Sequence, residues 1–200
     1  MGHTYSYQMF IHQALLTALL INRICSGTGY FLGEASAEYF IGVNRKAIPI
    51  NTTLLSIQSE GFGGTKISTV SPYTVLETSI YDAVVSAFTQ EVLRKKVTIF
   101  TSMGPFGVCL SSTDVGSTRA VLSVYWRMFG ANSMVPMGDG LLYLGFLDGG
   151  LNLRTSIVIG AHQIEDNLLE FDLAASRLGF SSSLLSRETT CANFNFTSNA

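Results

Sequence analysis

Histidine and cysteine, the side chains most often used as zinc ligands, are few and scattered in this 200-residue sequence. Three histidines and three cysteines lie far apart, at His3, His12, Cys25, Cys109, His162 and Cys191. No CxxC pair occurs, and zinc sites in proteins are usually built from such pairs or from closely spaced histidines. The sequence therefore predicts neither a metal site nor a cofactor.

Two tripeptides fit the acceptor pattern for N-linked glycosylation, Asn-x-Ser/Thr. They begin at Asn51 and Asn195. The pattern is short, and it has a consequence only for a chain that passes through the secretory pathway. We expect both asparagines to carry glycans in a secreted form of the protein.

The composition favours a globular, mainly β domain. Charged residues make up 13% of the chain and hydrophobic residues 47%, with 19 glycines and 13 phenylalanines. Since about a quarter of the residues of an average soluble domain are charged, this chain is poor in charge. A formal net charge of −2 excludes the broad basic field that non-specific nucleic-acid binding needs. Such a composition suits a secreted β domain better than a helical cytosolic one.

Residues 1–33 differ from the rest of the chain. Their apolar run, 14–21, is shorter than the ~20 residues that a membrane-spanning helix needs. It has the length of the apolar core of a signal peptide, but no Lys or Arg precedes it and Arg23 follows it. We therefore expect a loosely packed N-terminal helix, with a poor secretion signal as the alternative, and no association with a membrane.

Short β-rich runs separated by turn signals dominate from residue 38 onward. The runs 39–43 and 47–50 bracket the turn-prone Asn44 and predict a hairpin. Further strands are expected at 54–57, 66–70, 106–110, 122–126, 141–147, 155–159, 168–172 and 177–181. This spacing predicts a sandwich or a barrel-like β fold.

One helix is predicted over about residues 80–95. Its apolar residues recur at helical spacing on one face, at Tyr81, Val84, Val85, Phe88 and Val92. Ser79 is placed to cap its N-terminus. The basic run 94–96 lies in the last turn, where cations suit the helix dipole. We interpret that run as a solvated helix end, with a basic binding patch as the alternative.

Several segments, in their order along the chain, resemble the C-terminal lobe of plant extracellular pepsin-like proteins that lack protease activity. This family includes dermal glycoproteins, xyloglucan-endoglucanase inhibitors and xylanase inhibitors. The matching segments are SAEYFIGV (36–43), IPINTTLLSI (48–57), GGTKISTVSPYTVLETSIYDAV (63–84), PFGVC (105–109), WRMFGANSMV (126–135), LGFLDGG (144–150), RTSIVIGAHQIEDNLLEFDLAASRLGFSSSLL (154–185) and TTCANFNFTS (189–198). The resemblance implies a mainly β fold over residues 34–200: one C-terminal lobe of the pepsin-like acid protease fold, with one or two short helices.

A pepsin-like protease needs two aspartates, one from each lobe, that share one proton. The aspartate of the C-terminal lobe stands in a D-[ST]-G-T turn, and the resemblance places Ser68 at its position and Val70 at that of the glycine. A serine hydroxyl does not ionise near neutral pH without a base, so it cannot replace the carboxylate. We therefore predict no catalytic residue and no enzyme. An aspartic endopeptidase, by family membership, is the alternative.

Ser68 also lacks the sequence context of a nucleophile, because no G-x-S-x-G motif surrounds it. The histidine of the resembling region is His162, near Glu165 and Asp166. We interpret Ser68 as a turn serine that hydrogen-bonds locally. His162 is expected to be an exposed loop residue, and the two acids to be solvated.

Proteins similar to this one plug the cleft of microbial endoglucanases or xylanases, enzymes that work with a carboxylate pair. Arginine suits such a plug, because it pairs bidentately with carboxylates and keeps its charge. The segments that match the inhibitory loops carry Arg119 and Arg187. Glu188 beside Arg187, and a shortened segment after Arg119, weaken the match. Surface or salt-bridged arginines are the alternative.

The resemblance also bears on the cysteines. In relatives the cysteine of the FGxC strand pairs with one in an L-C-L-G-F strand, where this chain has Tyr143. The cysteine of the TTC segment, here Cys191, pairs in relatives with the other lobe. Cys109 and Cys191 are therefore predicted to be free thiols or to pair with each other.

Taken together, the residues and the resemblance predict a non-catalytic extracellular protein of the plant cell wall. It is expected to inhibit microbial glycoside hydrolases, xyloglucanase or xylanase, as part of plant defence. The hydrolase is the expected partner, and a separate N-terminal lobe is a second one. A truncated product without a function of its own is a further alternative, because the sequence contains only one lobe.

Overall fold

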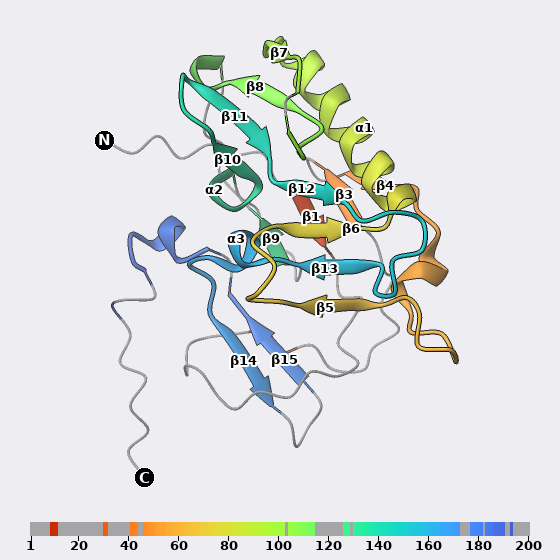
Figure 1. The fold of residues 1–200 in the computed structure, drawn as a ribbon. Coiled ribbons are helices and arrows are strands. Elements are labelled where there is room, and N and C mark those ends of the chain that lie inside the picture. Colours follow the sequence, from red (N-terminus) through yellow and green to blue (C-terminus); the bar gives the residue numbers. More distant parts are fainter. Residues whose placement is uncertain are drawn as a thin grey trace.

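The computed structural model describes residues 9–11, 30–31, 41–43, 46–102, 104–114, 126–128, 130–172, 177–181, 183–190 and 193. In this part of the chain, short strands form four sheets, and one long helix lies along one side of the molecule (Figure 1). The mainly β composition of the fold is therefore confirmed.

The sheet that positions the candidate site has the strand order β12-β6-β13-β5. Its strands are Phe146–Asp148 (β12), Thr74–Leu76 (β6), Ile157–Ile159 (β13) and Thr65–Ile67 (β5). β13 lies between β5 and β6, parallel to β5 and antiparallel to β6. The connection 68–73 from β5 to β6 therefore passes across the end of β13 (Figure 1).

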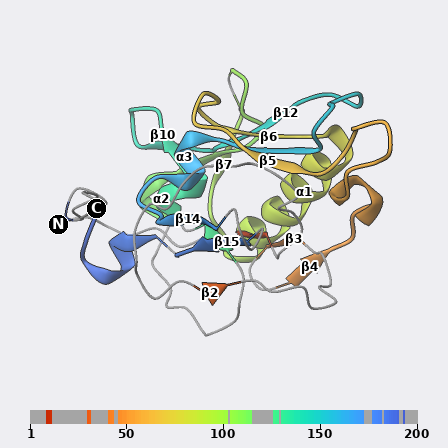
Figure 2. The ribbon, with the colours of Figure 1, turned by 90° about the horizontal axis from the view of Figure 1, so that it is seen from below.

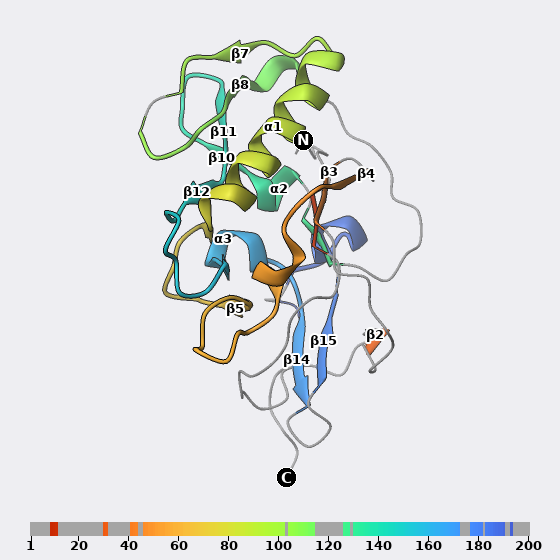
Figure 3. The ribbon, with the colours of Figure 1, turned by 90° about the vertical axis from the view of Figure 1, so that its right-hand side faces the viewer.

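Three further sheets complete the described fold. One has the order β10-β11-β8-β7, with strands Met134–Pro136, Leu141–Leu144, Cys109–Ser111 and Ile99–Phe100. Another has the order β4-β3-β1-β9, with strands Lys46–Ile48, Ile41–Val43, Met9–Ile11 and Trp126–Met128. The last has the order β14-β15-β2, with strands Leu169–Asp172, Arg177–Phe180 and Tyr30–Phe31. Figure 3 shows the β14–β15 hairpin extending away from the other sheets.

The long helix α1 (Thr78–Arg94) confirms the prediction over 80–95 but begins two residues earlier. Its N-cap is Glu77, and the predicted cap at Ser79 is wrong. The Glu77 carboxylate accepts hydrogen bonds from the backbone N–H groups of Ser79 (2.9 Å) and Ile80 (3.4 Å). These amides have no partner inside the helix, and a carboxylate also suits the positive end of the helix dipole.

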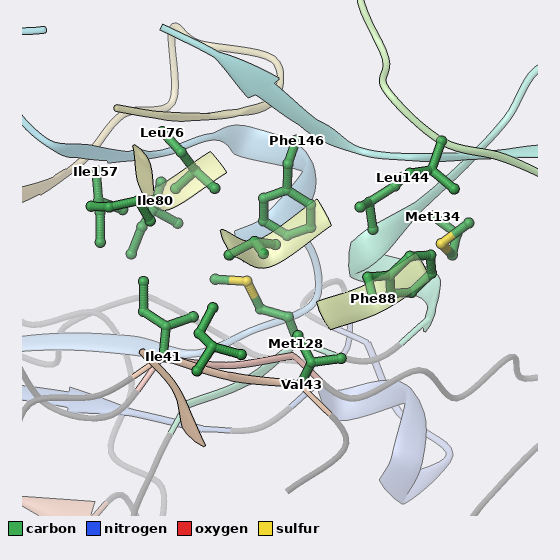
Figure 4. Packing of buried hydrophobic residues seen from close by; sticks show 14 of the residues in the cluster. Ile41, Val43, Leu76, Ile80, Phe88, Met128, Met134, Leu144, Phe146 and Ile157 are labelled. Carbon is green, nitrogen blue, oxygen red and sulfur yellow. The ribbon is translucent and has the colours of Figure 1, made fainter. Parts of the chain in front are cut away.

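α1 supplies the centre of the hydrophobic core, because its apolar face is buried between two sheets. Val84 and Val92 are fully buried on this face, as the periodicity predicts. Figure 4 shows Ile41 on one side of the helix and Leu76 and Phe146 on the other. Figure 2 shows the same helix beside β3 and β4. Burial of Leu76 and Phe146 against the helix fixes the positions of β6 and β12. The connection 68–73, which ends at β6, is therefore held at that end.

Two predicted strands have a different structure. Residues 54–57 are expected to be a strand, but Thr52–Leu55 form the 3₁₀ helix η1 because the Asn51 side chain accepts from the N–H of Thr53 (3.1 Å). The strand predicted at 141–147 is interrupted at Gly145, and its two halves belong to different sheets.

The other predicted strands agree to different extents with the structure. The hairpin of 39–43 and 47–50 is confirmed by the pairing of β3 with β4. The strands predicted at 155–159, 168–172 and 177–181 are confirmed as β13, β14 and β15. The prediction at 106–110 overlaps β8, the one at 66–70 ends at Ile67, and the one at 122–126 is described only at its last residue, in β9. β6, β7 and β10 were not predicted.

Besides η1, the described residues form four short helical segments: α2 (Gly130–Ser133), α3 (Ala161–Ile164) and the 3₁₀ helices η2 (Ser112–Asp114) and η3 (Leu184–Arg187), the last of which follows β15. In residues 1–33 the structure describes β1 and β2 alone, which pair with β3, β9 and β15. Residues 9–11 and 30–31 are strands, so the helix predicted in residues 1–33 is wrong at these positions. The apolar run 14–21 lies outside the described residues. The domain boundary at residue 34 stays a prediction. In the part of the chain that the structure describes, no helix has both the length and the apolarity to cross a membrane.

Candidate functional site

Ser68, which the resemblance aligns with the aspartate of the proteases, opens the turn that connects β5 to β6. Its N–H donates to the carbonyl of Ile159 in β13 (2.8 Å). Its Oγ accepts from the N–H of Ser71 (3.1 Å), so the hydroxyl serves the turn itself, as a local turn serine does. Among the described residues, no carboxylate is hydrogen-bonded to Ser68. The adjacent Val70 is 91% exposed.

The first residues of α3 hold the far side of this turn. The N–H of Ala161 donates to the carbonyl of Ser71 (2.8 Å), and the N–H of His162 donates to the carbonyl of Pro72 (2.9 Å). The first N–H groups of a helix have no intrahelical acceptor, so the turn supplies acceptors for them. α3 follows β13 with only Gly160 between them. The hydrogen bonds to α3 therefore hold the Ser68 turn against the end of β13, the strand that the turn crosses.

Gly160, between β13 and α3, is required by the close approach of the turn. A Cβ at this position would lie 2.2 Å from the carbonyl carbon of Tyr73 and 2.7 Å from the nitrogen of Thr74. The Gly160 N–H donates to the Oγ1 of Thr74 (3.0 Å). Only glycine allows the two backbones to come this close.

A buried glutamine joins the turn to two other segments. Gln163 is fully buried, and its Oε1 accepts from the N–H of Thr74 (2.8 Å). Its Nε2 donates to the carbonyl of Gly145 (2.7 Å), between β11 and β12. Both ends of the amide are satisfied, as burial of a polar group requires. The sequence analysis did not identify Gln163, Thr74 or Gly160 as residues that hold the turn. The one local signal for them was the glycine directly after the apolar strand 157–159.

His162 is not the exposed loop residue that the sequence predicts, because it lies in α3 with only 17% of its side chain exposed. Its Nε2 is 3.1 Å from the carbonyl oxygen of Met134, and its ring makes an edge contact with Tyr73. Its Nδ1 is 3.6 Å from the carboxylate of Glu165, whose side chain is 67% exposed, as predicted. Asp166 is half-buried, so the prediction that it is solvated is wrong in part. Among the described residues, no hydrogen bond joins His162 to Ser68.

The Asp148 carboxylate holds the turn that follows β12. Asp148 Oδ1 accepts from the Thr78 hydroxyl (2.7 Å) and from the Gly150 N–H (3.0 Å). These hydrogen bonds hold the pKa of Asp148 below its ordinary value of 3.8. Burial, and then the negative charge of Asp148, raise the pKa of Tyr81. The described residues contain no cluster of three or more groups able to hold a metal ion.

Cys109 is a free and fully buried thiol in β8, so the Cys109–Cys191 disulfide is not formed in this structure. The residue opposite it on β11 is Tyr143, which stands where the resemblance expects the partner cysteine. A hydrogen bond with the Cys109 thiol, together with burial, raises the pKa of Tyr143. The free-thiol alternative therefore describes Cys109.

The remaining predicted site residues are placed only in part. Arg119, Cys191 and Asn195 lie outside the described residues. Asn51 is exposed, immediately before η1. Arg187 is the last residue of η3, and the structure describes its backbone only.

The Ser68 turn and η3 come together around α3. The carbonyl of Asp166, just beyond α3, accepts from the N–H of Leu184 at the start of η3 (2.7 Å). The Ser68 turn is bound to the other end of α3 through Ala161. The structure thus holds the Ser68 turn and the backbone of η3 at the two ends of α3, and this part of the lobe is here called the α3 end.

A comparison with protein families finds one match, to a model described as "Xylanase inhibitor C-terminal", over residues 39–182. The chain is 55% identical over 199 residues to "Probable aspartic proteinase GIP2" from Nicotiana benthamiana, covering 91% of this chain and 45% of the relative. It is 42% identical over 190 residues to "Gamma conglutin 1" from Prunus dulcis, covering 88% of this chain and 43% of the relative.

Solved structures give a consistent result. The structure described as "Crystal structure of edgp" matches 98% of this chain and 49% of its own, with a TM-score of 0.71 and 50% identity. The chain thus spans about half the length of the relatives and of the solved structure that it matches. The matches confirm the resemblance found in the sequence, and with it the pepsin-like C-terminal lobe.

Proposed function

Because the chain belongs to the xylanase inhibitor C-terminal family, we propose that it is a non-catalytic extracellular plant protein that inhibits microbial glycoside hydrolases. Xyloglucanases and xylanases are the target classes, and defence of the cell wall is the role. The relatives named above come from plants. The resemblance aligns Ser68 with the catalytic aspartate of the proteases, and the observation that supports the proposal is that the Ser68 hydroxyl accepts a hydrogen bond from the Ser71 N–H within its own turn.

The proposal that the lobe is non-catalytic rests on proton chemistry. Peptide hydrolysis by a pepsin-like site needs two close carboxyl groups, one protonated and one ionised. Ser68 offers a hydroxyl whose oxygen already accepts a hydrogen bond from Ser71, and the neighbouring His162 is engaged with Met134. Neither arrangement leaves a base beside Ser68 in the described residues.

The inhibitory chemistry is assigned to Arg187, with Arg119 as the second candidate. An arginine held at the tip of a segment fits between the two carboxylates of a glycoside hydrolase cleft and forms charge-assisted hydrogen bonds with them. η3 carries Arg187 at the α3 end, where the N–H of Leu184 donates to the carbonyl of Asp166 just beyond α3. Since the chain spans about half of its relatives, an N-terminal lobe is a second proposed partner.

The test is the affinity of the purified chain for a microbial xyloglucanase and for a xylanase, measured by isothermal titration. Loss of one charge-assisted contact of about 1.5–3 kcal/mol predicts that Arg187→Ala binds roughly 10- to 150-fold more weakly. Arg154→Ala is the matched control, because Arg154 is an exposed arginine whose carbonyl binds the N–H of Gly63, before the start of β5 and away from the Ser68 turn. Equal weakening by both substitutions, or no binding by folded wild-type chain, contradicts the proposal.

An aspartic endopeptidase is the second candidate, favoured by the names of two relatives, "Probable aspartic proteinase GIP2" and "GIP1". It predicts cleavage of denatured casein at acid pH that pepstatin blocks. The hydroxyl at Ser68 predicts no such cleavage, and pepstatin-sensitive cleavage would favour this candidate over the inhibitor.

A further inference from the structure

Two aspartates of the chain, Asp139 and Asp148, are followed directly by glycine, and the fold holds them in different ways. An aspartate before glycine closes readily to a five-membered succinimide ring with the backbone, because glycine has no Cβ beside the attacking nitrogen. Ring closure needs two groups that can move, the side-chain carboxyl and the N–H of the glycine. Hydrogen bonds to either group therefore oppose the reaction.

Both groups are held at Asp148. The N–H of Gly149 donates to the carbonyl of Leu76 (2.8 Å). The carboxylate accepts from the Thr78 hydroxyl (2.7 Å) and from the Gly150 N–H (3.0 Å). Because these hydrogen bonds lower the pKa of Asp148, less of its carboxyl is in the protonated form that can lose water. The fold therefore protects this pair.

Neither group is held at Asp139, which lies at the tip of the β10–β11 hairpin. Residues 136–140 of this tip are all exposed. In the part of the chain that the structure describes, no hydrogen bond reaches the Asp139 carboxylate and none is donated by the N–H of Gly140. Both reacting groups of this pair are therefore open to rearrangement.

The backbone of the tip adds to this freedom. Asp139 has a φ of +49°, between Gly138 at +82° and Gly140 at +72°. The left-handed region is unfavourable for a residue with a side chain, and the two glycines turn easily on either side of it. The tip is closed by the N–H of Leu141, which donates to the carbonyl of Gly138 (2.9 Å) and occupies neither reacting group.

We propose that Asp139 converts spontaneously into isoaspartate as the protein ages, whereas the folded lobe protects Asp148. The Gly140 nitrogen attacks Cγ of the protonated Asp139 carboxyl. A C–N bond forms, the carboxyl C–O bond breaks, and the hydroxyl leaves as water with the amide proton. A second water then opens the succinimide at its α-carbonyl carbon and breaks the C–N bond there. The chain now runs through Cγ and the α-carboxylate is free, and no oxidant or reductant is consumed.

The product changes the tip and leaves the core in place. Isoaspartate adds one backbone carbon between Gly138 and Gly140, so the hydrogen bond from Leu141 that spans this residue is the one most directly affected. Leu142 and Leu144, further along β11, are buried and hold the strand. The reaction does not involve the α3 end, so it is independent of the proposed inhibition.

Peptide mapping of the aged protein compares the two pairs directly. Cleavage after Arg127 and Arg154 gives one tryptic peptide, 128–154, that contains both Asp139 and Asp148. Fragmentation of this peptide by electron transfer distinguishes isoaspartate from aspartate at each position. The purified full chain is incubated for weeks at neutral pH and physiological temperature, once folded and once in guanidinium chloride.

In the folded chain, isoaspartate should accumulate at position 139 about 10- to 100-fold faster than at position 148, because several hydrogen bonds must open first at Asp148. In the denatured chain the two rates should be comparable. Equal rates at both positions of the folded chain, or no isoaspartate at position 139, would overturn the proposal.

Two alanine substitutions in the tip identify the attacking nitrogen. Gly140→Ala places a Cβ beside that nitrogen and should slow the isomerisation of Asp139 several-fold. Gly138→Ala is the matched control: its φ is also positive and nothing lies within 4 Å of its Cβ, but the Asp139–Gly140 pair is kept, so the rate should stay close to that of wild type. Equal slowing by both variants, each shown to be folded by circular dichroism, would refute attack by the Gly140 nitrogen.

Discussion

Gly160→Ala is predicted to be among the most damaging single-methyl additions to this fold. The added Cβ would lie 2.2 Å from the carbonyl carbon and 2.3 Å from the carbonyl oxygen of Tyr73, where ordinary contacts begin near 3.4 Å. Both atoms belong to the backbone, so no side-chain rotation relieves the overlap. The Ser68 turn and β13 must move apart by about 1 Å, the difference between these contacts and ordinary ones.

The cost has two parts. Overpacking of a close backbone contact costs about 1–3 kcal/mol. Separation of the two segments also breaks the buried hydrogen bond from the Gly160 N–H to Thr74, and an unpaired buried group costs about 1–3 kcal/mol more. The sum, about 2–6 kcal/mol, is comparable with the whole stability of a small domain.

Urea denaturation followed by Trp126 fluorescence and circular dichroism measures this loss, provided that both signals give one transition. Gly104→Ala is the control, because nothing lies within 4 Å of its added Cβ and its φ of +78° leaves only backbone strain. That strain costs about 1–2 kcal/mol. If Gly160→Ala costs no more than Gly104→Ala, the close approach of the Ser68 turn to β13 is refuted.

Three further predictions concern the buried glutamine, the Asp148 turn and the free thiol. Gln163→Met keeps the volume but leaves two backbone groups without their partners, so we expect a loss of about 2–4 kcal/mol in urea denaturation; an unchanged midpoint would contradict the hydrogen bonds given above. Because the folded-state pKa of Asp148 is lowered, its carboxylate stabilises the fold above the unfolded pKa and this contribution is lost as the pH falls through the folded pKa. The Asp148→Asn variant should therefore be less stable than wild type at neutral pH and equal to it in strong acid, and a difference that persists below that transition would count against this sign. Tyr143→Cys should form a disulfide with the opposing Cys109, detected as two free thiols in the denatured variant rather than four, and four free thiols under oxidising conditions would refute the register of β8 with β11.

The sequence predicted those helices and strands whose structure follows from the pattern of residues within the element itself. The helix α1 follows from apolar residues such as Val84 and Val92 at helical spacing, and tertiary packing preserves that face. The cap was predicted at Ser79 because serine is a preferred N-cap residue. In the structure the longer Glu77 side chain accepts from the N–H groups of Ser79 and Ile80, and residue preferences alone do not predict this geometry. The strand predicted at 54–57 failed for a local reason as well, since Asn51 caps a 3₁₀ turn there.

Contacts between distant segments explain the rest of the differences. The break at Gly145 depends on Gln163, eighteen residues later, which binds the Gly145 carbonyl. His162 looks like a loop residue in the sequence, but its ring is half-buried against Tyr73 and Met134. Ser68 was identified by resemblance, whereas its role in the turn follows only from the position of Ser71. These contacts join residues that are distant in the sequence or depend on the exact turn geometry, so hydrophobic periodicity and motif spacing do not predict them.

The most direct test of the central claim is the rate of xyloglucan and xylan hydrolysis by microbial enzymes as purified, folded chain is added. An inhibitor without catalytic activity predicts a saturable fall in the rate of at least one enzyme, with both the enzyme and the chain intact afterwards by mass spectrometry. Undiminished rates for both enzymes at micromolar excess of folded chain, or cleavage of the hydrolase by the chain, would contradict it.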